Sequence, residues 1–269
     1  MKNVPTLTSL SLCKSEFTSD DAKLVSTAIA KHKGLSFVDL SKCGLGENEG
    51  NNILHTLLKG CKNLNGLDMS RNCFGHQHLA IIAKFVASHK KIAILNLEGN
   101  KFDDSSVASL NNALEKNKTL VELSLLHTSI SLATKTQRSL VLNNNLMHID
   151  LSCNDLGANG AKSIIKHLKK NPPLSMLSLA SCDLPSKSAK GLCNALKRNT
   201  NLAHLDLQSN SFNTIFCGCF EEEHISLNPR HAPQRYQGSE RKKGAHQSCS
   251  LRSNKFTRLL NPIIHASCG

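Results

Sequence analysis

The chain has 269 residues, 39% of them hydrophobic, and 33 Lys and Arg against 20 Asp and Glu give a formal net charge of +13. This hydrophobic content is enough to build a core, which excludes a wholly disordered chain. No apolar run reaches the about 18 residues that a transmembrane helix needs. Aromatic residues make up only 4%, which disfavours proteins that stack nucleic-acid bases on aromatic rings. We expect a folded protein with no membrane insertion and no specific nucleic-acid partner.

The N-terminal segment, MKNVPTLTSL, lacks the apolar stretch of a secretory signal peptide, and this favours a cytoplasmic location. The chain contains 11 cysteines. In a reducing compartment they are expected to be thiols rather than a disulfide framework.

One pattern, L-x-x-L-x-L-x-x-N/C-x-L, recurs along the first 212 residues, with other apolar or small polar residues at some positions. Successive copies start 28, 29, 28, 28, 26, 28 and 28 residues apart, a regularity that chance does not produce. The eight copies start at Leu7, Leu35, Leu64, Ile92, Leu120, Leu146, Leu174 and Leu202.

Each copy predicts a short strand and then a turn. The alternating apolar positions of L-x-x-L-x-L send one face of a strand into a core. The Asn or Cys that follows stands where the chain must turn, and a buried Asn there can satisfy backbone groups of neighbouring coils. This position holds Ser15, Cys43, Asn72, Asn100, Thr128, Asn154, Cys182 and Asn210.

The second half of each repeat predicts an amphipathic helix. Apolar residues recur at spacings of three and four in the segments 19–34, 76–91 and 158–170. A strand and a helix in about 28 residues build a solenoid, with strands on its concave face and helices on its convex face.

These repeats resemble the leucine-rich-repeat family. The 28-residue period, the full helix and the Asn or Cys at the turn look like the ribonuclease-inhibitor-like subclass, over residues 7–212. The resemblance implies an α/β horseshoe of about eight strand–helix repeats with a parallel sheet on the concave face. The subclass contains cytosolic binding proteins, sensor regions of NLR immune receptors, CARMIL actin regulators and Ran GTPase-activating proteins. A complete NLR is excluded because the chain has no nucleotide-binding P-loop.

The side chains between the strand leucines should line the concave face. Phe37, Ile94 and Met176 are expected to be exposed there as apolar anchors for a protein partner. Four aspartates in the next column should attract a basic protein and repel phosphate backbones. The candidate partner-binding residues are Phe37, Asp39, Asp68, Ile94, Asn96, Glu122, His148, Asp150, Met176, His204 and Asp206.

Charge also follows the predicted helices, with acids such as Asp20 and Asp21 at their starts and lysines such as Lys90 and Lys91 at their ends. The lysines would form a basic strip along one rim. An anionic partner is one interpretation, but favourable interaction with the helix dipole explains the same positions without a partner.

No catalytic constellation emerges, so we expect a protein that is not an enzyme and that has no cofactor and no metal. His76 and His78 are two residues apart and do not share a helix face. Cys217 and Cys219 are too close together for the usual zinc-binding pair. Asn117-Lys118-Thr119 matches the glycosylation sequon, which would be inert in a cytoplasmic chain.

The period stops after Phe212, so residues 213–269 are predicted to be an irregular, largely disordered tail whose Phe216 region covers the last repeat. The short fifth repeat should be locally irregular.

The leading functional hypothesis is a non-enzymatic scaffold that binds a protein along the concave face. The alternatives are a truncated fragment of an NLR-type sensor or CARMIL-type actin regulator and, third, a GTPase-activating protein.

Overall fold

The computed structural model describes residues 6–46, 50–102, 104–132 and 144–212. Within them, eight three-residue strands form one open parallel sheet in chain order, so every strand pairs with the strand of the next repeat. The strands are β1 (Ser9–Ser11), β2 (Phe37–Asp39), β3 (Gly66–Asp68), β4 (Ile94–Asn96), β5 (Glu122–Ser124), β6 (His148–Asp150), β7 (Met176–Ser178) and β8 (His204–Asp206).

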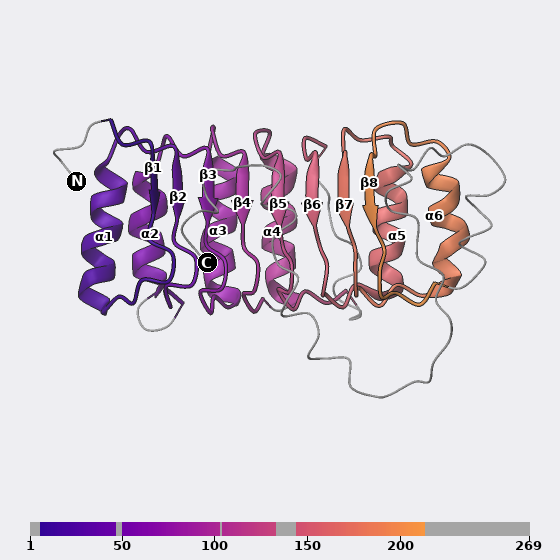
Figure 1. Ribbon diagram of the computed structural model, residues 1–269, viewed down its shortest axis with the longest axis horizontal. Coiled ribbons are helices and arrows are strands. Elements are labelled where there is room, and N and C mark those ends of the chain that lie inside the picture. The colour runs from indigo at the N-terminus through magenta and orange to yellow at the C-terminus, as the bar shows by residue number, and fades with distance from the viewer. Residues whose placement is uncertain (1–5, 47–49, 103, 133–143, 213–269) are drawn as a thin grey trace.

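In the described residues, a helix lies between each two successive strands except between β5 and β6, and the helices form a second layer along the sheet (Figure 1). The predicted helices at 19–34, 76–91 and 158–170 are confirmed as α1, α3 and α5. The helices are α1 (Ser19–Lys31), α2 (Gly50–Gly60), α3 (His76–Ser88), α4 (Asp104–Lys116), α5 (Gly157–Leu168) and α6 (Ala189–Leu196), the last preceded by the 3-10 turn Ser186–Ser188.

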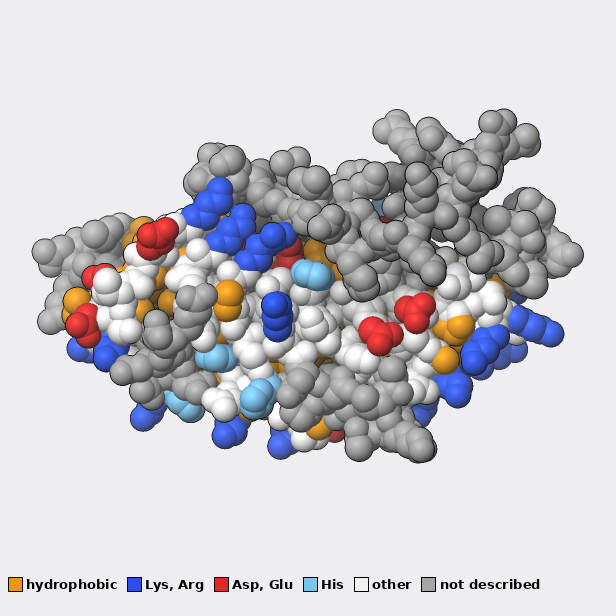
Figure 2. All heavy atoms as spheres, turned by 90° about the horizontal axis from the view of Figure 1, so that it is seen from below, with side chains coloured by type: hydrophobic (Ala, Val, Ile, Leu, Met, Phe, Trp, Pro, Cys, Tyr) orange, Lys and Arg blue, Asp and Glu red, His pale blue; other side chains and the backbone are white. Residues whose placement is uncertain are grey.

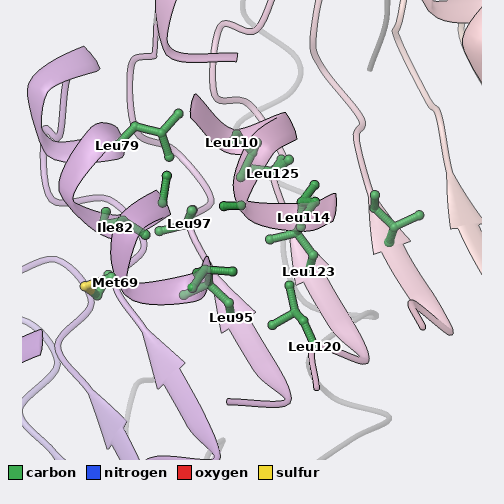
Figure 3. Packing of buried hydrophobic residues seen from close by; sticks show 14 of the residues in the cluster. Met69, Leu79, Ile82, Leu95, Leu97, Leu110, Leu114, Leu120, Leu123 and Leu125 are labelled. Carbon is green, nitrogen blue, oxygen red and sulfur yellow. The ribbon is translucent and has the colours of Figure 1, made fainter. Parts of the chain in front are cut away.

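The core lies between the two layers and runs the length of the solenoid. In the central repeats, Leu95 of β4 and the adjoining Leu97 face Ile82 of α3 and Leu114 of α4, and all four are almost completely buried (Figure 3). Every repeat contributes leucines of this kind, so each coil buries its apolar surface against its neighbours.

The predicted role of the turn asparagines is confirmed. The side-chain oxygen of Asn72 accepts the backbone N–H groups of Cys43 and Leu45 in the preceding coil, at 3.0 and 3.2 Å. Its amide nitrogen donates to the carbonyl oxygens of Leu40 and Ser70, at 2.7 and 3.2 Å. The same kinds of bond recur at Asn100, Asn154 and Asn210.

Cysteine replaces asparagine at two of these turns by donating from its thiol. Cys43 Sγ donates to the carbonyl oxygen of Leu12 at 3.1 Å, and Cys182 Sγ donates to that of Leu151 at 3.2 Å. Burial raises the pKa of Cys43 to about 11 and that of Cys182 to about 12. Both thiols therefore keep the proton that the hydrogen bond needs.

A second polar ladder ties the coils together beyond the helix ends. The side-chain oxygen of buried Asn117 accepts the N–H groups of Thr119 and Leu120, and its amide nitrogen donates to the carbonyl oxygen of Val86 at 2.7 Å. His89 stands at the same place one coil earlier, where its Nδ1 accepts the N–H of Ile92 at 2.9 Å.

The structure corrects one expectation about the cysteines and leaves others outside the described residues. Cys153 is disulfide-bonded, which corrects the expectation that all cysteines are thiols. The predicted tail, the Phe216 contact and most of the predicted irregularity of the fifth repeat lie outside the described residues. Among the described residues, no helix is long and apolar enough to cross a bilayer.

Candidate protein-interaction surface

The strand side chains that point away from the core form two continuous columns, in the register expected from the sequence. The first column pairs Ser9, Phe37, Gly66, Ile94, Glu122, His148, Met176 and His204. The second pairs Ser11, Asp39, Asp68, Asn96, Ser124, Asp150, Ser178 and Asp206. We call the sheet surface that these two columns form the open face.

The three predicted apolar anchors are half-buried rather than fully exposed. Phe37 shows why, because its ring lies over the α-carbon of Gly66 on the next strand. A β-carbon at Gly66 would fall 2.4 Å from Phe37 Cδ2, which is inside van der Waals contact. The missing side chain at Gly66 thus provides the space that the Phe37 ring occupies.

The middle of the open face combines apolar and titratable groups. The half-buried Ile94 and Met176 lie in the first column on β4 and β7, and Met147, which directly precedes β6 at the border of this face, is 43% exposed. Between those strands, His148 Nδ1 lies 3.4 Å from Glu122 Oε1. Burial raises the pKa of Glu122, and the adjacent His148 ring opposes that rise.

The aspartates of the second column are less available than the sequence suggested. Asp39 and Asp150 are only 4% and 7% exposed. In each, one carboxylate oxygen accepts the N–H of the residue two positions later, from Ser41 and Ser152, both at 2.9 Å. The same bond occurs at Asp68, Asp206 and, with an amide oxygen, Asn96. These side chains therefore hold the turn that follows each strand.

Burial also changes the acidity of two of these carboxyl groups. Loss of hydration raises the pKa of Asp68 to about 6, despite the hydrogen bonds from Ser70 and Asn96. Asp150 also reaches about 6, for the same reason, with a smaller contribution from the negative charges of Glu98 and Asp206.

Two residues that the sequence analysis considered for metal binding or glycosylation have structural roles instead. His78 Nδ1 accepts the N–H of Gly75 at 3.1 Å, and its ring lies 5.1 Å from that of Phe74, so it caps α3. Asn117 of the sequon is 2% exposed, with its amide nitrogen hydrogen-bonded. Within the described segments, no group of three or more His, Cys, Asp and Glu is placed to hold a metal ion.

Sequence reasoning missed a row of residues at the turns that follow the strands. At this position every coil adopts a positive φ, between 53° and 68°. The signal was available, since each of these residues directly precedes the turn Asn, Cys, Ser or Thr. The row runs Lys14, Lys42, Arg71, Gly99, His127, Cys153, Ser181 and Ser209.

Repeated leucines, an open parallel sheet and one helical layer define an α/β leucine-rich-repeat solenoid. No protein-family model matches the chain, and no curated protein matches it. Among the solved structures that match is leiomodin-1 actin-binding site 2, at 13% identity and a TM-score of 0.30, over 77% of this chain and 73% of that one. Another is the leucine-rich-repeat-containing protein LegL7 from Legionella pneumophila, at 19% identity and a TM-score of 0.49, over 75% of this chain and 66% of that one.

Proposed function

We propose that the protein is a non-enzymatic, cytoplasmic scaffold that binds another protein along the open face, and that its repeats belong to the ribonuclease-inhibitor-like subclass. The observation that carries this proposal is the mixed patch at the middle of the face. Apolar side chains that keep part of their surface in solvent surround the Glu122–His148 pair there. Such a mixture is typical of protein-binding surfaces.

The mechanism is display at fixed intervals. Strand pairing holds neighbouring side chains of one column about 4.8 Å apart. Because this array is already ordered before binding, little conformational entropy of this protein is lost when a partner binds. Met147 and Met176 supply adaptable apolar area, because thioether side chains fit surfaces of different shape. The basic partner expected from the aspartate column stays a prediction, as do the sensor-fragment, actin-regulator and GTPase-activating alternatives.

The test compares full-length variants that each add one negative charge. Met176→Asp alters the open face, and Met147→Asp, tested separately, alters the border of that face beside β6. Leu24→Asp on α1 is the matched control, because Leu24 is 70% exposed and lies on the helical layer. Thermal melts monitored by circular dichroism establish that all three fold.

Quantitative affinity enrichment from cytosol then measures capture by each variant. We expect a partner that is bound by the unmodified chain and by Leu24→Asp but is depleted about tenfold or more with Met147→Asp or Met176→Asp. If the open-face variants capture the same proteins as the control, binding does not use this face and the proposal is wrong.

A further inference from the structure

The first three members of the row of left-handed turns are all basic. Lys14, Lys42 and Arg71 follow β1, β2 and β3, and each is exposed. They are neighbours in space because the N–H of each donates to a carbonyl of the next coil, from Lys14 to Ser41 and from Lys42 to Ser70, both at 2.9 Å. Three cationic side chains therefore stand side by side at one edge of the open face.

Helix capping does not account for this row. The lysines at helix ends, such as Lys31 and Lys116, complement the helix dipole and need no partner to explain them. Lys14, Lys42 and Arg71 instead follow strands, where no such dipole acts. Each also takes a left-handed backbone that disfavours a residue with a β-carbon by roughly 1–2 kcal/mol relative to the right-handed form.

Arg71 is held in a defined orientation. Its guanidinium donates to Glu98 Oε1 at 2.6 Å, and its backbone N–H donates to the Glu98 carbonyl at 2.7 Å. A β-carbon at Gly99 would fall 2.7 Å from Arg71 Cγ, so the side chain crosses the next coil where glycine leaves room. About 40% of the Arg71 side chain stays exposed, and an ordered guanidinium can bind a carboxylate with two hydrogen bonds.

The cations at this edge lie beside buried carboxylates. Asp39 and Glu98 are 4% and 7% exposed, whereas Lys14 and Lys42 are exposed residues. In the view from below, a run of Lys and Arg side chains lies over the N-terminal, left half of the molecule (Figure 2). A hollow of about 270 Å³ opens beside Lys42, and its lining includes Phe17, Gly44 and the carboxylate-bearing Glu16.

We propose that Lys14, Lys42 and Arg71 are the docking row for an acidic linear segment of the protein that binds the open face. This rests on the proposed function, which it refines by assigning one part of the partner to repeats one to three. Two intervals of about 4.8 Å make the row roughly 10 Å long, which matches two or three acidic side chains of an extended peptide. A nucleic acid fits less well, because a row of this length meets only two or three phosphates, and nucleic-acid affinity grows with the number of phosphates that are neutralised.

The probe is a fluorescein-labelled decapeptide with glutamate at every second position, titrated against the full-length chain by fluorescence anisotropy in low salt. The test variant is Lys14→Gln/Lys42→Gln. Lys169→Gln/Lys170→Gln, two exposed lysines beyond α5, removes the same net charge and is the matched control. The glutamine version of the peptide, a ten-nucleotide polyuridylate RNA and phosphatidylserine vesicles are compared on the same proteins.

We expect the dissociation constant for the glutamate peptide to rise about tenfold in the test variant and less than about twofold in the control. Lys14→Arg/Lys42→Arg should restore binding, and the glutamine peptide should not bind. Equal weakening by both double variants would show that only net charge matters, and would overturn the assignment. It would also be overturned if RNA or vesicles bound as tightly and lost binding in the same variant.

This outcome is separable from that of the enrichment experiment. If Met147→Asp and Met176→Asp lose no partner, the proposed function is wrong whatever the peptide does. If those variants lose a partner but the glutamate peptide does not distinguish the two lysine pairs, the scaffold stands and the docking row is wrong.

Discussion

Single polar side chains at the turns hold adjacent coils together in this solenoid. Asn72 is fully buried and bonds to backbone groups of its own coil and of the preceding one. The sequence predicted this role because the motif places a small polar residue where two coils must exchange hydrogen bonds. A solvent-exposed turn would not require it.

Asn72→Ala should lower the free energy of unfolding by about 3–5 kcal/mol, because it leaves several buried N–H and C=O groups without partners. Asn210→Ala is the control, since Asn210 makes the same kinds of bond but is only half-buried and water can replace them. Urea denaturation of both variants checks this. Equal losses at the two sites would contradict the role assigned to burial.

Asp150 gives a prediction for pH dependence. Its pKa is raised from 3.8 to about 6 by burial, so the folded state binds the proton more tightly than the unfolded state. Its contribution to stability is therefore most favourable below pH 4 and is lost as the pH rises through about 6. Asn96, one of its counterparts in the column, shows that an amide can accept the same turn hydrogen bond.

Asp150→Asn should accordingly stabilise the protein by roughly 1–3 kcal/mol at pH 7.5 and by much less at pH 4. Denaturation midpoints of the two proteins across this range measure the difference. Taking the difference removes the contributions of other titrating groups that the two proteins share. A constant difference at all pH values would refute the explanation.

For the strands, the sequence predicts order and register well but predicts the exposure of surface side chains less well. The leucine pattern sets the order and register of β1 to β8, because a shift of one residue would expose the core side chains. The exposure of Phe37 could not be predicted in the same way. It depends on Gly66, 29 residues later in the chain, whose missing side chain matters only once the strands are paired.

The same limit applies to the second column. Sequence placed Asp39 and Asp150 on the open face correctly, but their hydrogen bonds to the following turns depend on backbone geometry that the pattern does not specify. The left-handed turns were missed because the residue types at these positions do not indicate them. Lysine, arginine and serine are not residues that signal a positive φ, so only the strict repetition of the position reveals it.

The Phe37–Gly66 contact can be measured by a double-mutant cycle. Gly66→Ala should destabilise the unmodified chain by about 1–2 kcal/mol, because the new methyl group displaces the Phe37 ring. In a Phe37→Ala background the same change should be neutral or slightly stabilising, since alanine has less backbone entropy to lose than glycine. An identical effect in both backgrounds would mean that the two residues do not interact.

The whole molecule should be most stable in its middle. Leu67, Leu95 and Leu123 of the central strands are 0–1% exposed, whereas Leu10 of β1 and Leu205 of β8 are half-buried. A coil in the centre packs against two neighbours, and a coil at either end of the described region packs against fewer.

Amide hydrogen exchange should therefore be slowest in β3, β4 and β5 and faster in β1 and β8, by about tenfold or more. Mass spectrometry of peptides from the full-length chain gives this profile directly. Uniform protection from β1 to β8 would contradict it, and would show that the solenoid opens as a single unit.

The ladder of turn side chains has a mechanical consequence. The bonds from Asn72 and Asn154 to the preceding coil join residues 24–32 positions apart, so none of them spans more than neighbouring coils. Pulled from its two ends, the solenoid should peel from its outer coils inward in discrete steps. Each step unfolds one repeat, which lengthens the extended chain by up to roughly 100 Å. Under load the molecule would therefore lengthen in a series of small steps.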